Sequence, residues 1–242
     1  MIEWQGIKKS FGSKEVLRGV DLNVPEGSLF GFAGINGAGK STLIKCFLGF
    51  LKPDSGSMTL DNKSLENVHF KRLIGYLPEV FQPPLDLKCC EFLNYAHSLI
   101  RKKELSKKEI EAVLEQAGLP GSSSLLIRQL SKGMRQRLGI AQAMVHSPKI
   151  LILDEPFSGL DPIGRFELKE LFKSIYNQGK TLFFSSHNLS EIQDLCTHMA
   201  VLHKGRIEAM NTVDGLLQQY ECKSLEKVFL TVIGHPLNGE KE

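Results

Sequence analysis

The stretch that decides the fold is GINGAGKST, residues 34–42. It follows a nearly continuous apolar run, Leu29–Ala33, and precedes apolar residues at helical spacing that begin at Leu43. A glycine-rich loop between a strand and a helix is the context that the phosphate-loop pattern requires. Average residue usage would produce this spacing by chance about one time in a hundred in a chain of this length. The stretch therefore predicts a nucleoside triphosphate site.

Each part of the loop suits the binding of phosphate groups. Glycines let the backbone curl, so that successive N–H groups and the N-terminus of the following helix face a polyphosphate. Lys40 adds a mobile positive charge, and the hydroxyl of Ser41 can bind Mg²⁺. The residues expected to contact the nucleotide are Gly34, Asn36, Gly37, Ala38, Gly39, Lys40, Ser41 and Thr42.

A second apolar run, residues 149–153, ends in two acids, Asp154 and Glu155. The run is too apolar for a sheet with one wet face, which indicates a strand of a buried parallel sheet. Two acids after a strand more often cap the next helix, but the upstream loop favours a catalytic role. We expect Asp154 to hold Mg²⁺ through its water shell. We expect Glu155 to orient or deprotonate an attacking water.

The remaining pattern predicts an α/β fold, a phosphate-loop NTPase (RecA-like) core with a mainly parallel sheet. Val20, Leu22 and Val24 alternate, which indicates a strand. The expected fold also has an antiparallel β region at the N-terminus. Residues 83–146 are expected to form an inserted helical subdomain, with a capping box at Ser106 and Glu109. We expect one domain over residues 1–242, with the α/β core in 1–82 and 147–205 and a C-terminal extension in 206–242. The other expected elements are a strand at 74–77, a helix from Asp161 with Phe166, Leu171, Phe172 and Ile175 inward, a strand at 181–185, a helix capped by Ser190, a last strand at 199–202 and a helix at 224–232.

Composition narrows the class of protein without choosing a partner. The 242 residues include 30 Lys+Arg and 27 Asp+Glu, a net charge of +3, with 42% hydrophobic residues. These values exclude a disulfide-stapled miniprotein and a mainly disordered chain. The five cysteines form no C-x-x-C pair, which favours a reduced compartment, and adjacent Cys89 and Cys90 are expected to be packing residues. No apolar run reaches the roughly 18 residues of a membrane span, so we expect a chain that neither crosses a bilayer nor is exported.

The order of motifs resembles that of ATP-binding cassette (ABC) ATPases. The phosphate loop is followed by LSKGMRQR at 130–137, by Asp154-Glu155 and by SGLD at 158–161. The segment 130–137, called the signature segment below, is absent from GTPases, kinases and helicases. The resemblance implies a head-to-tail dimer that encloses two ATP molecules. In such a dimer Ser131, Lys132, Gly133 and Asp161 contact the nucleotide bound by the opposite protomer.

The resemblance also assigns residues that the pattern alone leaves open. Phe11, otherwise read as a core residue, would stack on adenine, and Val16 would contact ATP. His187 would reach the γ-phosphate. The expected catalytic residues are therefore Glu155, His187 and Lys40. Glu79 stands where most members of the family have a magnesium-sensing glutamine, and Gln82 is the alternative for that role. Lys132 and Met134 also depart from the common signature.

The resemblance implies an ATP-hydrolysing subunit, with ATP and Mg²⁺, that drives a separate membrane permease. Glu79 and the C-terminal helix favour export. The expected partners are that permease and a second ATPase subunit, identical or a near relative, at the cytoplasmic face of the cell membrane. The alternative is a soluble ABC-type ATPase acting on nucleic acid or the ribosome, favoured only by basic residues at 101–103 and 107–108. Those branches usually carry two cassettes or a long coiled coil, so no nucleic acid is expected.

Overall fold

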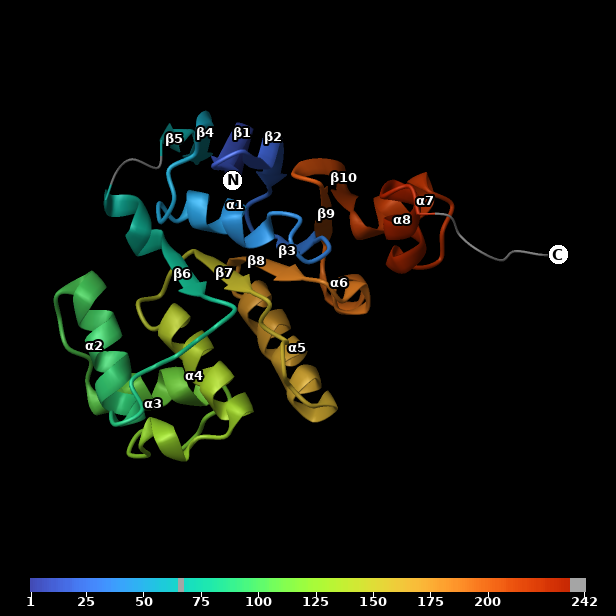
Figure 1. Ribbon diagram of the computed structural model, residues 1–242. Helices are drawn as coiled ribbons and strands as arrows, with labels where there is room; N and C mark the ends of the chain where they lie inside the picture. The colour runs from blue at the N-terminus through green and yellow to red at the C-terminus, as the bar shows by residue number, and fades with distance from the viewer. Residues whose placement is uncertain (65–67, 236–242) are drawn as a thin grey trace. The chain divides into compact units, whose positions relative to one another are not determined.

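A computed structural model describes residues 1–64 and 68–235. The chain folds as two compact units, one formed by residues 1–67 and 183–242 and the other by residues 68–182. The elements of each unit are labelled in Figure 1. The predicted limits of the helical subdomain, 83 and 146, stay a prediction.

The first unit contains a four-stranded antiparallel sheet at the N-terminal end of the chain, with strand order β2-β1-β4-β5. Val20, Leu22 and Val24 of β2 are buried while their neighbours are not, which is the predicted alternation. The antiparallel β region is thus confirmed. Its strands are β1 (Ile2–Phe11), β2 (Lys14–Val24), β4 (Ser55–Leu60) and β5 (Lys63–Ser64).

The same unit contains the strand that precedes the phosphate loop. β3 (Leu29–Ala33) is buried along its whole length and runs parallel to β9 (His198–His203). The helix α1 (Lys40–Phe47) follows the loop, and the ring of its last residue packs 4.8 Å from that of Trp4. β8 (Thr181–Ser186), also fully buried, joins the two units along the chain.

The prediction that residues 199–202 form the last strand is wrong. β10 (Arg206–Thr212) pairs with β9 in antiparallel register across a two-residue turn, Lys204-Gly205, in which both residues have positive φ. Such turns join hairpins because their twist matches that of the strands. Only Ala209 of β10 is buried, so the strand lacks the apolar alternation by which the others were found.

The second unit combines two parallel strands with helices. β6 (Ile74–Leu77) runs parallel to β7 (Ile150–Asp154), with Leu77 beside Leu153. A Cβ atom at Gly75 would overlap the carbonyl of Ala143, so the missing side chain lets a helix lie directly on β6. The helices are α2 (Cys89–Arg101), α3 (Lys107–Gln116), α4 (Lys132–Met144) and α5 (Pro162–Asn177), with 3₁₀ turns at Val68–Leu73 and Ile127–Gln129.

The helices α2, α3 and α4 enclose an apolar cluster of their own, which includes Leu93, Leu114 and Leu138. The capping box at the start of α3 is confirmed, since Ser106 Oγ accepts from Glu109 N at 3.3 Å and Glu109 Oε2 accepts from Ser106 N at 2.7 Å. The sequence predicts three helices and no strand in residues 88–146. The structure agrees, since α2, α3 and α4 lie in this range and no strand does.

Two details of the predicted helices are wrong. Phe166 is 64% exposed, because the buried face of α5 is formed by Leu168 and residues three, four and seven positions later. A residue two positions before Leu168 points away from that face. The helix α6 (Leu189–Leu195) is capped by Asn188 rather than Ser190, whose backbone N–H donates to Asn188 Oδ1 at 3.2 Å.

Two helices end the described chain. α7 (Val213–Gln219) was not predicted, and α8 (Leu225–Val232) lies within the predicted helix at 224–232. α8 packs on α6 and α7. Within residues 1–64 and 68–235, no helix has the length and apolar character needed to cross a membrane.

Candidate functional site

The phosphate loop leaves the N-terminus of α1 open to an anion. The cap residue of α1 is Gly39, which offers no capping side chain, and the first turn of the helix carries no acid. Backbone N–H groups at a helix start form the positive end of the helix dipole and normally need an acceptor. This helix end is therefore suited to a phosphate group.

Two glycines in the loop are required by close contacts. A Cβ atom at Gly34 would lie 2.6 Å from the carbonyl oxygen of Leu202. A Cβ atom at Gly39, where φ is +111°, would lie 2.9 Å from Leu17 Cδ2 and 3.3 Å from the carbonyl oxygen of Val16. The loop thus curls tightly against β2 and β9, a path that a residue with a side chain cannot follow.

Lys40 lies within the curl of the loop. Its Nζ donates to the carbonyl oxygen of Gly34 at 2.6 Å, and the residue is only 7% exposed. Ser41 and Thr42, the next residues of α1, are half-buried. An ammonium group, a hydroxyl and a helix N-terminus thus occur together around one turn of backbone, which is a set that fits the phosphates of ATP.

Two residues assigned by resemblance lie in the same unit. Phe11, at the end of β1, is 49% exposed, with Lys9 Nζ 5.7 Å from its ring centroid, so the core interpretation of Phe11 is wrong. An exposed ring face is what stacking on a base needs. Val16 touches the phosphate loop, since its Cγ1 lies 3.4 Å from the Cβ position of Gly39.

His187 follows the last residue of β8 and is exposed, in a turn held by polar contacts. The buried carboxylate of Glu191 accepts from Ser186 Oγ at 2.9 Å and from Asn188 Nδ2 at 3.3 Å. Asn188 N donates to Ser186 Oγ at 3.0 Å. The sequence analysis missed Glu191, although an acid four residues after a histidine, within the first turn of a helix, was a signal.

The two predicted acids lie at the end of β7. Asp154 is 2% exposed and Glu155 is 8% exposed. Because β6 and β7 are parallel with Leu77 beside Leu153, Glu79 and Asp154 emerge at the same edge of the strand pair. Burial of Tyr76, together with the negative charges of Asp154 and Glu79, raises the pKa of its hydroxyl to about 12. The structure thus brings Glu79 close to the predicted metal-binding acid, and the role of Gln82 stays open.

Glu155 has an unusual backbone conformation. Its φ is +50°, in the left-handed region that a residue with a side chain rarely adopts. The next residue is Pro156, which favours an extended conformation in the residue before it. Such a conformation persists only where surrounding contacts impose it, and it is typical of functional positions.

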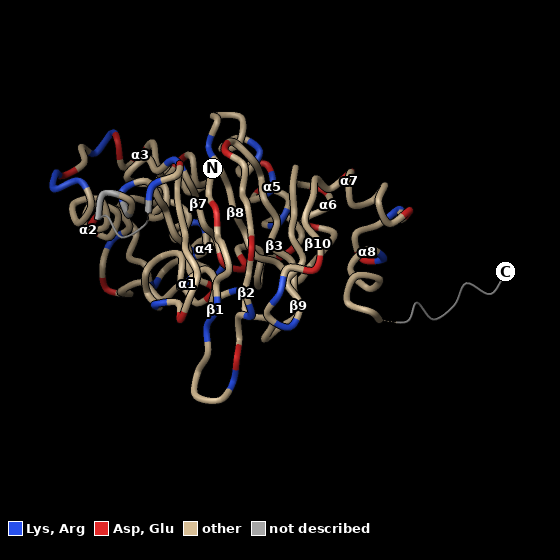
Figure 2. The backbone as a smooth tube through the Cα atoms, turned by 90° about the horizontal axis from the view of Figure 1, so that it is seen from above, with Lys and Arg blue, Asp and Glu red and all other residues tan. Residues whose placement is uncertain are grey.

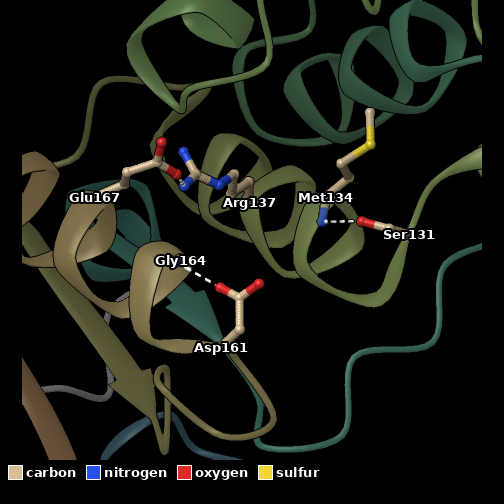
Figure 3. Close-up of polar contacts among 6 residues, drawn as sticks. All are labelled: Ser131, Met134, Arg137, Asp161, Gly164 and Glu167. Atoms are coloured by element: carbon tan, nitrogen blue, oxygen red, sulfur yellow. Dashed lines mark hydrogen bonds and ion pairs between the residues drawn. The ribbon is translucent and has the colours of Figure 1, made fainter.

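The signature segment and the loop 158–161 lie together in the second unit. Ser131 Oγ caps α4 by accepting from Met134 N at 3.2 Å, and Asp161 Oδ1 caps α5 by accepting from Gly164 N at 2.7 Å (Figure 3). The side chain of Lys132 lies across Gly159, filling the space of its absent Cβ. The four residues predicted to act in trans are therefore grouped on one surface region of one unit.

Ionic and polar contacts brace this region. Arg137 of α4 forms an ion pair with Glu167 of α5, also drawn in Figure 3. Gln136 Nε2 donates to the carbonyl oxygen of Pro156 at 2.9 Å. The sequence analysis missed both roles, because side-chain partners far apart in the chain leave no local pattern.

The predicted metal ligands are a hydroxyl and two carboxylates. They are Ser41 in one unit and Asp154 with Glu79 in the other. Mg²⁺ is usually held by one or two carboxylates together with substrate phosphates, and this set is of that kind. Among residues 1–64 and 68–235, no three His, Cys, Asp or Glu side chains gather into a metal-binding group.

Comparison with known proteins identifies the family. The ABC transporter family matches residues 17–158, which is more than half of the chain, so the chain belongs to this family. A solved ATP-binding subunit of an ABC transporter has a TM-score of 0.85 and 29% sequence identity, covering 96% of this chain and 99% of that one. The predicted family and the predicted α/β phosphate-loop fold are both confirmed.

Two named relatives are similar over most of the chain. The lantibiotic transport ATP-binding protein SrtF of Streptococcus pyogenes is 34% identical over 231 residues, 95% of this chain and 96% of the relative. The bacitracin transport ATP-binding protein BcrA of Bacillus licheniformis is 39% identical over 212 residues, 86% of this chain and 68% of the relative. This chain spans only 61% and 55% of the length of two further curated relatives.

The fold also occurs in a cassette solved as a dimer. The bacterial ABC transporter cassette MJ0796 has a TM-score of 0.80 and 24% identity, covering 88% of this chain and 99% of that one. At this identity the likeness shows the fold alone. It does not transfer the dimer to this chain.

Proposed function

We propose that this chain is the ATP-binding and ATP-hydrolysing subunit of an ABC transporter and that it drives a separate membrane permease. The observation that carries the proposal is the phosphate loop, in which an open helix start and the Lys40 ammonium surround one turn of backbone in a member of the ABC family. This arrangement supports the binding of a nucleoside triphosphate. The supporting relatives SrtF and BcrA are named as transport ATP-binding proteins.

Binding and hydrolysis use different groups of this chain. Backbone N–H groups of the loop and the Lys40 ammonium bind the phosphates, and the exposed ring of Phe11 stacks on adenine. Ser41 and Asp154 hold Mg²⁺, with Glu79 at the same edge of β6 and β7. When bound, the metal neutralises negative charge on the phosphates.

The hydrolytic step is assigned to Glu155 and His187. The Glu155 carboxylate accepts a proton from the attacking water, a role in which a positioned acid–base group contributes about 10²–10⁴-fold to the rate. His187 donates to the γ-phosphate from the turn that Glu191 holds. Lys40 stabilises the charge that develops on the transferred phosphoryl group.

The working unit in this proposal is a head-to-tail dimer. Ser131 and Gly133, at the N-terminus of α4, contact the nucleotide of the opposite protomer, and Lys132 and Asp161 lie beside them. The cassette MJ0796, which has the same fold, was solved as a dimer, and this supports dimerisation as such. The second protomer is either a copy of this chain or a near relative.

The permease is proposed to dock on the second unit, near residues 79–88. Val80 is 67% exposed and Leu85 is 47% exposed, and the helix α2 that follows carries exposed Tyr95 and Leu99. Apolar side chains gathered on a surface are typical of protein interfaces. In this arrangement the chain lies at the cytoplasmic face of the membrane. Glu79 and the C-terminal helix favour export, and the names of SrtF and BcrA support a role in transport.

The nucleic-acid alternative has less support. Lys and Arg residues gather where α2 ends and α3 begins (Figure 2). One of them, Arg101, donates to the carbonyl oxygen of His146 at 2.6 Å and so has a structural role. Lysine side chains at helix ends are usually solvated, and we do not assign them a partner.

The proposal is tested by replacing Glu155 with Gln. ATP binding should persist while turnover falls at least about a hundredfold, the lower range for a lost acid–base group. The same variant should form dimers with ATP on gel filtration, and adding Ser131→Arg should abolish those dimers. Near-normal turnover in Glu155→Gln would remove Glu155 from its role, and dimers that survive Ser131→Arg would contradict the in-trans contact.

A further inference from the structure

The backbone that carries Glu155 is held by a side chain of the signature segment. The carbonyl oxygen of Pro156, the residue after Glu155, accepts from Gln136 Nε2 at 2.9 Å. Pro156 itself is buried, and a buried carbonyl needs a hydrogen-bond partner. The amide of Gln136 thus meets a requirement of the backbone next to the proposed general base.

This contact acts on a part of the chain that is strained. Glu155 combines a φ of +50° with a following proline, and both features are unfavourable. Beyond Pro156, Ser158 N donates to the carbonyl oxygen of Glu155 at 3.1 Å, and the ring of Phe157 packs 5.4 Å from that of Phe172. Gln136 adds the contact from α4, so the tight turn is fixed from α4 and α5 together.

Gln136 also lies close to the residues proposed to meet the partner's nucleotide. It is the fifth residue of α4, one turn after Lys132, and the helix begins at its cap Ser131. One rigid turn of helix therefore separates the in-trans contact from the amide that holds Pro156. Gln136 thus links the helix that begins at Ser131 to the backbone that carries Glu155.

We propose that Gln136 is a positioning residue for Glu155, which sets the direction of its carboxylate by holding the Pro156 carbonyl. This inference rests on the proposed role of Glu155 as general base. Gln136 touches neither nucleotide nor water in this scheme. Because a misplacement of about 1 Å costs on the order of 10²-fold in rate, loss of the bond should reduce the catalytic rate rather than ATP affinity.

The test compares four single variants of the full chain. Gln136→Met keeps the size of the side chain and removes the donor, and Gln136→Glu keeps the shape while presenting only acceptors at neutral pH. Both should lower kcat about tenfold to a hundredfold, with KM for ATP within about twofold. Gln136→Lys restores a donor and should recover most of kcat. The matched control is Gln116→Met, since Gln116 of α3 makes only a 3.5 Å contact with Gln178, and its kcat should stay within about twofold.

A double-mutant cycle separates positioning from a merely structural role. In the Glu155→Gln background, adding Gln136→Met should change the residual single-turnover rate by less than about twofold, because the group that Gln136 positions is gone. An equal loss in both backgrounds, a rise in KM with unchanged kcat, or unchanged kcat in Gln136→Met and Gln136→Glu would overturn the proposal. Near-normal turnover in Glu155→Gln alone would instead refute the role of Glu155 as general base, and loss of ATP binding by the unaltered chain would refute the proposed function.

Discussion

The phosphate loop and the signature segment are held in their shapes by different groups. The phosphate loop is shaped mainly by its own backbone, since Gly34 lies close to the Leu202 carbonyl, Gly39 lies close to Leu17 and the Val16 carbonyl, and Lys40 binds a carbonyl of the same loop. The signature segment is held mainly by side chains, since Gln136 donates to the Pro156 carbonyl and Arg137 forms an ion pair with Glu167. The comparison shows that a substitution has different consequences in the two places.

The largest effect is expected in the phosphate loop from Gly39→Ala. A Cβ there would press on Leu17 Cδ2 at 2.9 Å, and the φ of +111° is unfavourable for alanine, at a cost of about 1–3 kcal/mol. The loop must change its path, so affinity for a non-hydrolysable ATP analogue should fall tenfold or more by calorimetry. The matched control is Gly37→Ala, where a Cβ would meet nothing within 4 Å and only the φ of +80° is unfavourable.

That pair of variants can contradict the comparison directly. If Gly39→Ala binds nucleotide as well as the unaltered chain does, the close contacts at Gly39 are not what shapes the loop. An equal loss in both would assign the effect to positive φ alone.

The second largest effect is expected from Arg137→Met in the signature segment, and it concerns stability. The Arg137 side chain is 14% exposed while that of Glu167 is 53% exposed, so the pair lies between a buried and a surface ion pair. Removing the charge should lower the free energy of unfolding by about 2 kcal/mol, between the surface and buried ranges. Affinity for the ATP analogue should stay within about twofold, because the phosphate loop does not depend on these side chains.

Glu167→Gln provides the cycle for this ion pair. Denaturant unfolding of both single variants and the double variant should show a coupling free energy, since each substitution removes the same interaction. Fully additive losses would mean that α4 and α5 do not depend on the pair.

The same contrast explains how far the sequence predicted the molecule. The phosphate loop, β3 and β7 were read from glycine spacing and apolar runs, because backbone conformation and burial on both faces leave marks on consecutive residues. The family, the fold and the helical character of residues 88–146 followed from motif order and helical spacing.

The missed features depend on contacts between distant residues. β10 is an edge strand with one buried residue, and its turn was not recognised from Lys204-Gly205. The hydrogen bond from Gln136 to Pro156 joins positions twenty residues apart, and a single sequence contains no local signal for it. The same is true of the positive φ of Glu155. The exposure of Phe11 is contrary to the core interpretation, because an aromatic residue after an alternating strand favours the core, and its contact with adenine stays a prediction.

The smallest effect concerns acid stability of the second unit, where His146 follows α4. The ring is buried, its Nε2 lies 3.0 Å from the carbonyl oxygen of Ile74, and its Nδ1 has no hydrogen-bond partner among the described residues. Burial lowers the pKa of His146; the bond to Ile74 raises it, and the positive charges of Arg101, His97 and Lys180 lower it further. Folded His146 therefore binds a proton less readily than the unfolded residue, whose pKa is about 6.5.

The sign of the pH dependence follows from this difference. Stability is fully present above about pH 6.5 and is lost as pH falls, because protons bind the unfolded chain preferentially. The thermal midpoint should decrease between pH 7.5 and 5.5, and His146→Gln, which stays neutral, should decrease less. Burial also lowers the pKa of His97, so some dependence should remain in the variant. Parallel curves of thermal midpoint against pH for the two proteins would show that protonation of His146 does not weaken this unit in acid.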